Sequence, residues 1–148
     1  MSFDKRTILV VEDNEDDWFI LQRAIKVANI LNPVRHVPDG QQAIDYLQGA
    51  GPFSDRTAFP SPSLVLLDLK LPVKQGFEVL SWARQNPLLK GMVIVILTSS
   101  KAESDIAKAY ALGANAFLVK PTAADKLADA MKAMDIFWFR HNQFQYLD

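Results

Sequence analysis

Five polar residues of this sequence each stand where a short apolar run ends. They comprise three acids, a threonine and a lysine: Glu12, Asp13, Asp68, Thr98 and Lys120. Carboxylates crowded at one site repel one another by an amount on the order of 4 kcal/mol per pair at contact distance in an intermediate dielectric, and a hard divalent cation relieves that repulsion. A lysine charge and a threonine hydroxyl suit phosphoryl oxygens. Together these residues predict an oxygen-only Mg²⁺ site at which Asp68 is the nucleophile for a phosphoryl group.

These residues come together only if the runs before them are parallel strands of one sheet. Continuous apolar runs occupy residues 7–11, 64–67, 92–97 and 116–119, and residues 34–37 are a weaker candidate. Because the runs are continuous rather than alternating, both faces of each strand are expected to be buried under helices. Each of the five runs is followed by a segment whose apolar residues have helical spacing. This order predicts a doubly wound α/β fold of (βα)₅ type, a five-stranded parallel sheet with the flavodoxin-like order 2-1-3-4-5, in which ligands bind at the carboxyl ends of the strands.

Local signals predict where several helices begin and end. Asn14 is the expected N-cap of the first helix, with Asp17 three residues on. Thr122 and Asp125 form a capping-box-like start to the last helix, and Gly113 is expected to end the helix before it. Apolar residues with helical spacing mark the first helix and a stripe of the last helix that can pack inward: Ile20, Ala24, Ala28 and Leu31, then Leu127, Met131, Met134 and Trp138.

Composition excludes several other classes of protein. The 148 residues, 49% of them apolar, suffice for one domain, and the absence of cysteine removes disulfide frameworks, thiolate metal sites and cysteine nucleophiles. Because 16 Lys and Arg balance 17 Asp and Glu, the chain lacks the positive field that nucleic-acid binders use. The sequence shows neither a secretion signal nor an apolar run of membrane-spanning length. We therefore expect a cytoplasmic protein that binds neither nucleic acid nor membranes.

Two features fall outside the strand-end pattern. Residues 49–63 (GAGPFSDRTAFPSPS) form a long, proline-rich loop before the third strand. Loops of this length are uncommon in compact domains and are usually functional or mobile, but we favour a tolerated surface insertion over a dedicated binding element. The two histidines, His36 and His141, are interpreted as solvated or packing side chains because neither follows a predicted strand.

Short motifs around the strand ends resemble those of the response-regulator receiver family over nearly the whole chain. They are VVEDN at residues 10–14, LLDLKLP at 66–72, Gly76, LTS at 97–99 and VKP at 119–121. The resemblance implies that a phosphohistidine on a sensor histidine kinase donates its phosphoryl group to Asp68. It also implies that Asp13 and Asp68 bind Mg²⁺ (or Mn²⁺) directly, that Glu12 commonly binds through water, and that the main-chain carbonyl of Lys70 completes the site.

The same resemblance implies a two-state switch. Thr98 matches the hydroxyl that follows the phosphoryl group, and Phe117 matches the aromatic residue that changes rotamer with it. Phosphorylation would draw Thr98 inward, turn Phe117 in and alter the face formed by the fourth helix, fifth strand and fifth helix. By itself, Phe117 is equally consistent with a core residue.

The signal is expected to leave through a protein surface, because the short segment after Lys120 is too small for an output domain. Residues 1–148 are thus predicted to be a single receiver domain that binds its kinase, a downstream phosphotransfer protein or a second copy of itself. The insertion and the aromatic tail, residues 137–148, look like those of the small response regulators paired with cyanobacterial phytochromes. The tail either folds back on its own domain or, as we favour, forms a homodimer contact through several aromatic residues: Trp138, Phe139, Phe144 and Tyr146.

An enzyme is the principal alternative. Phosphatases of the haloacid-dehalogenase type also place a nucleophilic aspartate after a buried strand and use Mg²⁺, but they require a second aspartate two residues later, where this chain has Lys70. We therefore expect self-phosphorylation and slow autodephosphorylation rather than turnover of other substrates. A nucleotide-binding module fits less well, because the first turn (VVEDNEDD) lacks the glycines that let a backbone approach a pyrophosphate.

Overall fold

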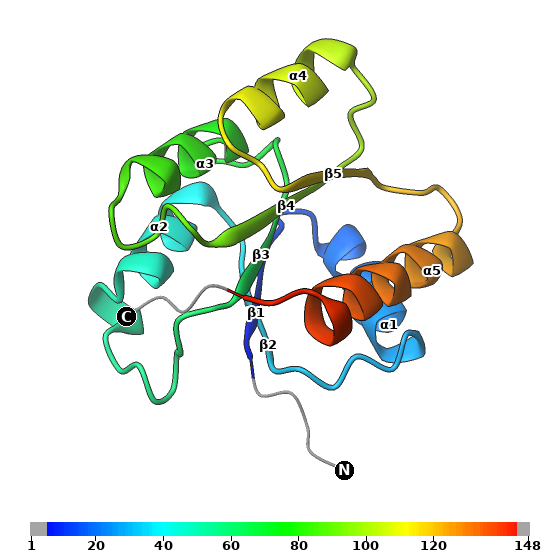
Figure 1. Ribbon diagram of the computed structural model, residues 1–148, viewed down its shortest axis with the longest axis horizontal. Helices are drawn as coiled ribbons and strands as arrows, with labels where there is room; N and C mark the ends of the chain where they lie inside the picture. The colour runs from blue at the N-terminus through cyan, green and yellow to red at the C-terminus, as the bar shows by residue number, and fades with distance from the viewer. Residues whose placement is uncertain (1–5, 145–148) are drawn as a thin grey trace.

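The computed structural model describes residues 6–144, and within them five strands form one parallel sheet (Figure 1). The strands are β1 (Ile8–Val11), β2 (Val34–Val37), β3 (Leu64–Leu67), β4 (Val93–Thr98) and β5 (Ala116–Val119). Their order is β2-β1-β3-β4-β5, and every neighbouring pair is parallel. The predicted doubly wound α/β fold with its flavodoxin-like order is confirmed. Since all strands run the same way, their carboxyl ends meet at one edge of the sheet.

Helices cover both faces of this sheet (Figure 1). They are α1 (Glu15–Val27), α2 (Gly40–Gln48), α3 (Gly76–Gln85), α4 (Glu103–Ala111) and α5 (Ala124–Met134), with a short 3₁₀ helix η1 (Gly51–Phe53) and a π-helical segment η2 (Asp135–His141). α1 and α5 pack on one face, and α2, α3 and α4 contribute to the core on the other. Each face has its own apolar core because successive residues of a strand point to opposite sides.

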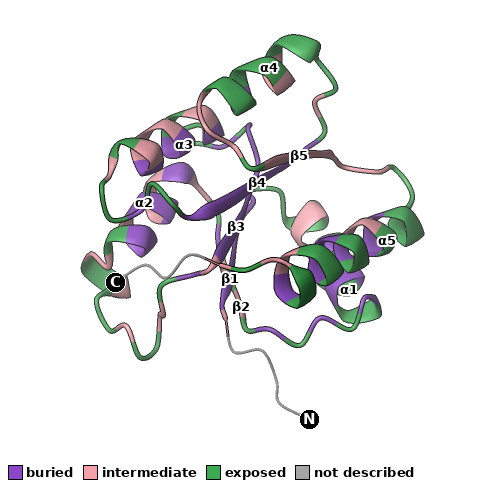
Figure 2. Ribbon diagram, in the orientation of Figure 1, coloured by how far each residue is buried: buried purple, intermediate pink, exposed green. Residues whose placement is uncertain are grey.

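Burial explains the continuous apolar runs of the sequence. Every residue of β1, β3 and β4 is buried, whereas the edge strands β2 and β5 are mostly only partly buried (Figure 2). A central strand covered on both faces has no polar side, so its sequence does not alternate. Among the helices of residues 6–144, none combines the length and the apolar character needed to cross a membrane.

Two of the predicted helix boundaries are confirmed, and one is wrong. The side chain of Asn14 caps α1 by accepting a hydrogen bond from the backbone N–H of Asp17 at 2.9 Å. Gly113, with φ of 104°, follows the end of α4. The capping box predicted for the last helix does not form, because the helical backbone begins one residue later and the N-cap is Ala123 rather than Thr122.

The buried face of α1 differs from the apolar spacing that marked this helix. Ala24 and Ala28 are buried as predicted, but Ile20 and Leu31 are 40% and 56% exposed, and Leu21 and Ile25 are buried instead. Adjacent helix positions differ by about 100° in direction, and the core lies on the side of Leu21 rather than that of Ile20. The predicted stripe of α5 is buried at three of its positions and half-buried at the fourth: Leu127, Met131 and Met134, then Trp138.

The insertion at residues 49–63 packs against α2 through an aromatic cluster. The ring centroids of Phe53 and Phe59 lie 5.1 and 6.0 Å from that of Tyr46, which is 1% exposed. The Tyr46 hydroxyl donates a hydrogen bond to the Pro60 carbonyl at 2.9 Å. The insertion therefore extends the core on this face of the sheet through Phe53 and Phe59.

The tail after α5 packs on the N-terminal segment of the same chain. Phe139 is buried, and the ring of Phe144 lies 5.5 Å from it. The Arg6 guanidinium lies 5.3 Å from the ring centroid of Phe139 and 4.5 Å from that of Phe144. Trp138 is half-buried against the same core. These three aromatic residues thus have cover within the chain, and Tyr146 lies outside the described residues.

Candidate metal centre

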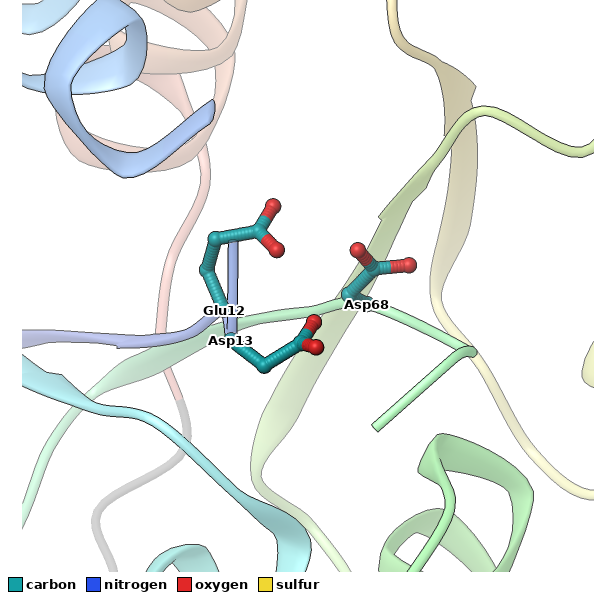
Figure 3. A group of neighbouring side chains, drawn as sticks. All are labelled: Glu12, Asp13 and Asp68. Atoms are coloured by element: carbon teal, nitrogen blue, oxygen red, sulfur yellow. The ribbon is translucent and has the colours of Figure 1, made fainter. Parts of the chain in front are cut away.

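Three carboxylates meet at the carboxyl edge of the sheet. Glu12 and Asp13 directly follow β1, and Asp68 directly follows β3, the neighbouring strand. One oxygen of each lies within 4.8 Å of the others, and the side chains face a common space (Figure 3). Glu12 and Asp68 are buried while Asp13 is exposed, so the cluster is open to solvent on one side. The structure brings together the three acids that the sequence places at these strand ends.

Backbone contacts beyond the strands position two of these acids. The Glu12 N–H donates to the Val37 carbonyl at 3.2 Å, and the Asp68 N–H donates to the Val11 carbonyl at 3.2 Å. Gly76 packs tightly against the turn after Asp68, because a Cβ at this position would lie 2.2 Å from the Asp68 carbonyl oxygen. Any larger residue would displace the backbone that carries the acid.

Lys120 reaches the cluster from the end of β5. Its backbone N–H donates to the Thr98 carbonyl at 2.7 Å, which continues the β4–β5 pairing. Its Nζ donates to Asp68 Oδ2 at 2.9 Å, to Asp17 Oδ2 at 3.1 Å and to Glu12 Oε1. An ammonium group has three donors, so each of them has a carboxylate partner.

Burial and neighbouring charges shift two pKa values in the cluster. Burial raises the pKa of Glu12 to about 7, although Lys120 opposes this rise by hydrogen bond and charge, and the charge of Asp68 adds to it. Burial alone would lower the pKa of Lys120, but its hydrogen bonds to Asp68 and Glu12 and their charges outweigh burial and raise it. Lys120 therefore stays charged at neutral pH, whereas the raised pKa of Glu12 lies close to that pH.

The donor set fits a hard divalent cation. Glu12, Asp13 and Asp68 offer only oxygen ligands, and the positive charge of Lys120 does not balance three carboxylates. Mg²⁺ and similar cations prefer oxygen ligands and keep several waters, for which the open side at Asp13 leaves space. The backbone N–H of Lys70 lies 3.4 Å from Asp68 Oδ1, so Lys70 borders the cluster.

Thr98 lies on β4, the strand next to β3 and Asp68, and Phe117 lies on β5, the strand beyond β4. Thr98 ends β4, is 1% exposed and accepts a hydrogen bond at Oγ1 from the backbone N–H of Ser100 at 3.5 Å. Phe117 pairs with Ile96 across the β4–β5 register and is half-buried against the core to which α2, α3 and α4 contribute. The switch residues named from the resemblance thus occupy adjacent strands that are joined by backbone hydrogen bonds.

Two further residues contact the cluster without having been assigned to it from the sequence. Asp17, interpreted only as part of the α1 cap, binds Lys120 through its carboxylate. Its place in the first turn of the helix that directly follows the acids after β1 was an available signal. The ring atom Nε2 of His36 lies 2.7 Å from the carbonyl oxygen of Glu12. No sequence signal pointed to this contact, because the partner atom belongs to the backbone.

Sequence comparisons with known proteins agree on one family for this chain. The model of the response regulator receiver domain matches residues 8–132. The chain is 36% identical to response regulator Rcp1 of Synechocystis sp. over 133 residues, which cover 90% of this chain and 88% of Rcp1.

Solved structures of similar chains have the same fold. Phosphorylated RcpA, a cyanobacterial phytochrome response regulator, gives a TM-score of 0.88 at 32% identity and covers 97% of this chain and 100% of RcpA. The Mn²⁺-bound form of Rcp1 gives 0.85 at 34% identity, with 95% and 99% coverage. The bacteriophytochrome response regulator RtBRR gives 0.78 at 40% identity, with 96% and 85% coverage. Because the family model spans most of its length, the chain belongs to the response regulator receiver family.

Proposed function

We propose that this chain is a phosphorylation switch in which Asp68 accepts a phosphoryl group with the help of Mg²⁺. The observation that carries the proposal is the position of Lys120, whose Nζ lies 2.9 Å from Asp68 Oδ2 beside the buried Glu12. A fixed positive charge at the nucleophile suits a transferred group with negative charge on its oxygens. The phosphorylated form of RcpA and the Mn²⁺-bound form of Rcp1 support the same chemistry.

The transfer forms a bond between an Asp68 carboxylate oxygen and phosphorus while the bond from phosphorus to the donor's histidine nitrogen breaks. The imidazole leaves with the electron pair of that bond. Asp68 needs no general base, because an ionised carboxylate attacks without losing a proton. Asp13, Asp68 and the Lys70 carbonyl would hold the cation, with Glu12 binding it through water, and the cation would neutralise charge on the phosphoryl oxygens.

Lys120 must exchange one of its partners to contact a phosphoryl oxygen, because all three of its donors are engaged. Asp17 is the partner whose release costs least, since its side chain is 43% exposed and can be rehydrated, whereas that of Glu12 is 4% exposed. Lys120 then stabilises the charge that develops on the transferred group.

Self-phosphorylation followed by slow autodephosphorylation is the proposed extent of the catalysis. A phosphatase of the haloacid-dehalogenase type would need a carboxylate two residues after Asp68 to act as general acid, and this position is Lys70. Water alone must then attack the acyl phosphate, so the modified state persists long enough to carry a signal.

Incubation with acetyl phosphate and Mg²⁺ followed by intact-mass spectrometry tests the phosphoacceptor. We expect one phosphoryl adduct in the wild type, none when EDTA removes the cation, and none in Asp68→Asn. Asp55→Asn, in the exposed part of the insertion, is the matched control and should be labelled like the wild type. An unlabelled wild type, or an adduct that persists in Asp68→Asn, would contradict the proposal.

Thr98 and Phe117 are proposed to carry the change from Asp68 to the face formed by α4, β5 and α5. The buried hydroxyl at the end of β4 and the half-buried ring on β5 support this role. Hydrogen exchange in these elements should change on phosphorylation of the wild type. In Thr98→Val the change should be lost while Asp68 is still labelled, and a full change in that variant would exclude the hydroxyl.

A histidine kinase of phytochrome type is proposed as the phosphoryl donor, in a receiver domain that spans residues 1–148. RcpA and RtBRR are phytochrome or bacteriophytochrome response regulators, and both cover nearly all of this chain. A downstream phosphotransfer protein is a further expected partner. Transfer from a phosphorylated kinase of this type to the wild type, and not to Asp68→Asn, tests the assignment. Labelling by acetyl phosphate without transfer from the kinase would reject the partner alone.

Homodimer formation through the tail is also proposed. Phe137 and Ile136 on η2 are 53% and 38% exposed, and the ring of Phe137 packs edge-on against Trp138 at 4.9 Å. Since Phe139 and Phe144 are covered within the chain, these exposed apolar side chains and Trp138 favour a symmetric contact with a second copy. Sedimentation equilibrium with and without phosphorylation should show a rise from monomer toward dimer mass. A monomer mass in both states at high concentration would exclude it.

A further inference from the structure

His36 contacts the acidic cluster from the edge of the sheet. It lies on β2, opposite Val10 in the β1–β2 register, and its ring Nε2 is 2.7 Å from the carbonyl oxygen of Glu12. Since a carbonyl oxygen only accepts hydrogen bonds, Nε2 must carry the proton in this contact. The bond holds the first carbonyl beyond the end of β1, where the strand turns toward α1.

The ring of His36 is itself held in place by Trp18. The two rings stack with centroids 4.2 Å apart and planes inclined by 11°. Trp18 belongs to the first turns of α1, and both side chains are half-buried. The loop that joins β1 to α1 and contains Asp13 and Asn14 is thus tied to β2 and α1 together, through one hydrogen bond and one ring stack.

This arrangement matters most for Asp13. The carbonyl that His36 binds belongs to the peptide group between Glu12 and Asp13, so the hydrogen bond sets the orientation of that peptide plane. Asp13 is exposed, and its carboxylate therefore depends on the backbone for its place in the cluster, unlike the buried Glu12 and Asp68. A rotation of this peptide would turn the Asp13 carboxylate away from the other two.

We propose that His36 is a positioning residue for the metal centre, which acts through its hydrogen bond to the Glu12 carbonyl. The inference rests on the proposed divalent-cation site and deepens it. Residues that orient metal ligands without touching the metal commonly change its affinity by about tenfold or more. The effect of His36 should therefore appear in metal affinity and not only in stability.

Mn²⁺ binding to the full chain, measured by electron paramagnetic resonance of the free ion, tests the role. His36→Phe keeps a ring to stack on Trp18 but removes the donor, and we expect its dissociation constant to rise about tenfold. His36→Gln keeps an N–H donor without the ring and should stay within about threefold of the wild type. His141→Phe makes the same substitution at an exposed histidine of the tail and should bind like the wild type.

Urea unfolding without metal shows whether each variant is folded under the conditions of the binding assay. Wild-type Mn²⁺ affinity in a folded His36→Phe would overturn the inference, as would an equal loss of affinity in folded His36→Gln. If His36→Phe does not fold, His36→Gln decides by itself, because retained affinity supports the donor role and lost affinity rejects it. A wild type that binds no Mn²⁺ would instead reject the proposed metal site.

Discussion

Glu12→Gln should change how the stability of the metal-free protein depends on pH. Burial raises the pKa of Glu12 from 4.5 to about 7, so between these values the folded state holds a proton that the unfolded state has released. The free energy of unfolding therefore falls as pH rises through this interval, because the unfolded state binds fewer protons. At about 1.4 kcal/mol per pH unit the full interval corresponds to roughly 3 kcal/mol, most of which is lost between pH 5 and pH 8.

Urea unfolding of both proteins in EDTA at pH 5 and pH 8 measures this effect. Glutamine keeps the size of the side chain but cannot ionise, so the stability of Glu12→Gln relative to the wild type should grow by about 2 kcal/mol between the two pH values. Glu103→Gln removes an exposed carboxylate at the start of α4 and serves as the control, with a much smaller difference. Parallel pH profiles for the wild type and Glu12→Gln would refute the burial argument.

Three further substitutions test separate contacts. Gly76→Ala should lower the free energy of unfolding by about 2 kcal/mol in urea, since its Cβ would lie 2.2 Å from the Asp68 carbonyl oxygen, and wild-type stability would disprove that close approach. Tyr46→Phe should cost about 1 kcal/mol in the same assay by removing the hydrogen bond to the Pro60 carbonyl, and an unchanged midpoint would show that this bond does not hold the insertion. Lys120→Met should slow the labelling of Asp68 by acetyl phosphate about a hundredfold, and a wild-type rate would remove Lys120 from the reaction.

The strand ends were predictable because the signal is local and strong. A buried parallel strand must be apolar throughout, so the first polar residue after it marks the carboxyl edge of the sheet. Glu12, Asp68 and Lys120 were located in this way, and the structure places them together. The N-cap at Asn14 was equally local, since it depends on a side chain and a backbone N–H three residues apart.

The face of a helix could not be predicted in the same way. Ile20 and Leu21 are adjacent and both apolar, and only the packing of α1 against α5 and the sheet decides that Leu21 is buried. The packing of the tail could not be predicted either. Phe139 and Phe144 are covered by Arg6, which lies at the other end of the chain. Contacts between residues distant in sequence leave no periodic trace in either segment.

The amino-acid sequence by itself determined the sheet, the edge at which its ligands gather, and the acids, hydroxyl and lysine found there, because each follows from residue types within one strand and its first turn. Only the tertiary structure decided how these groups act on one another. It buries Glu12 and so raises its pKa, gives Lys120 a third carboxylate in Asp17, and brings the ring of His36 to a backbone carbonyl. These effects depend on distances of about 3 Å between separate elements, and such distances are set by packing.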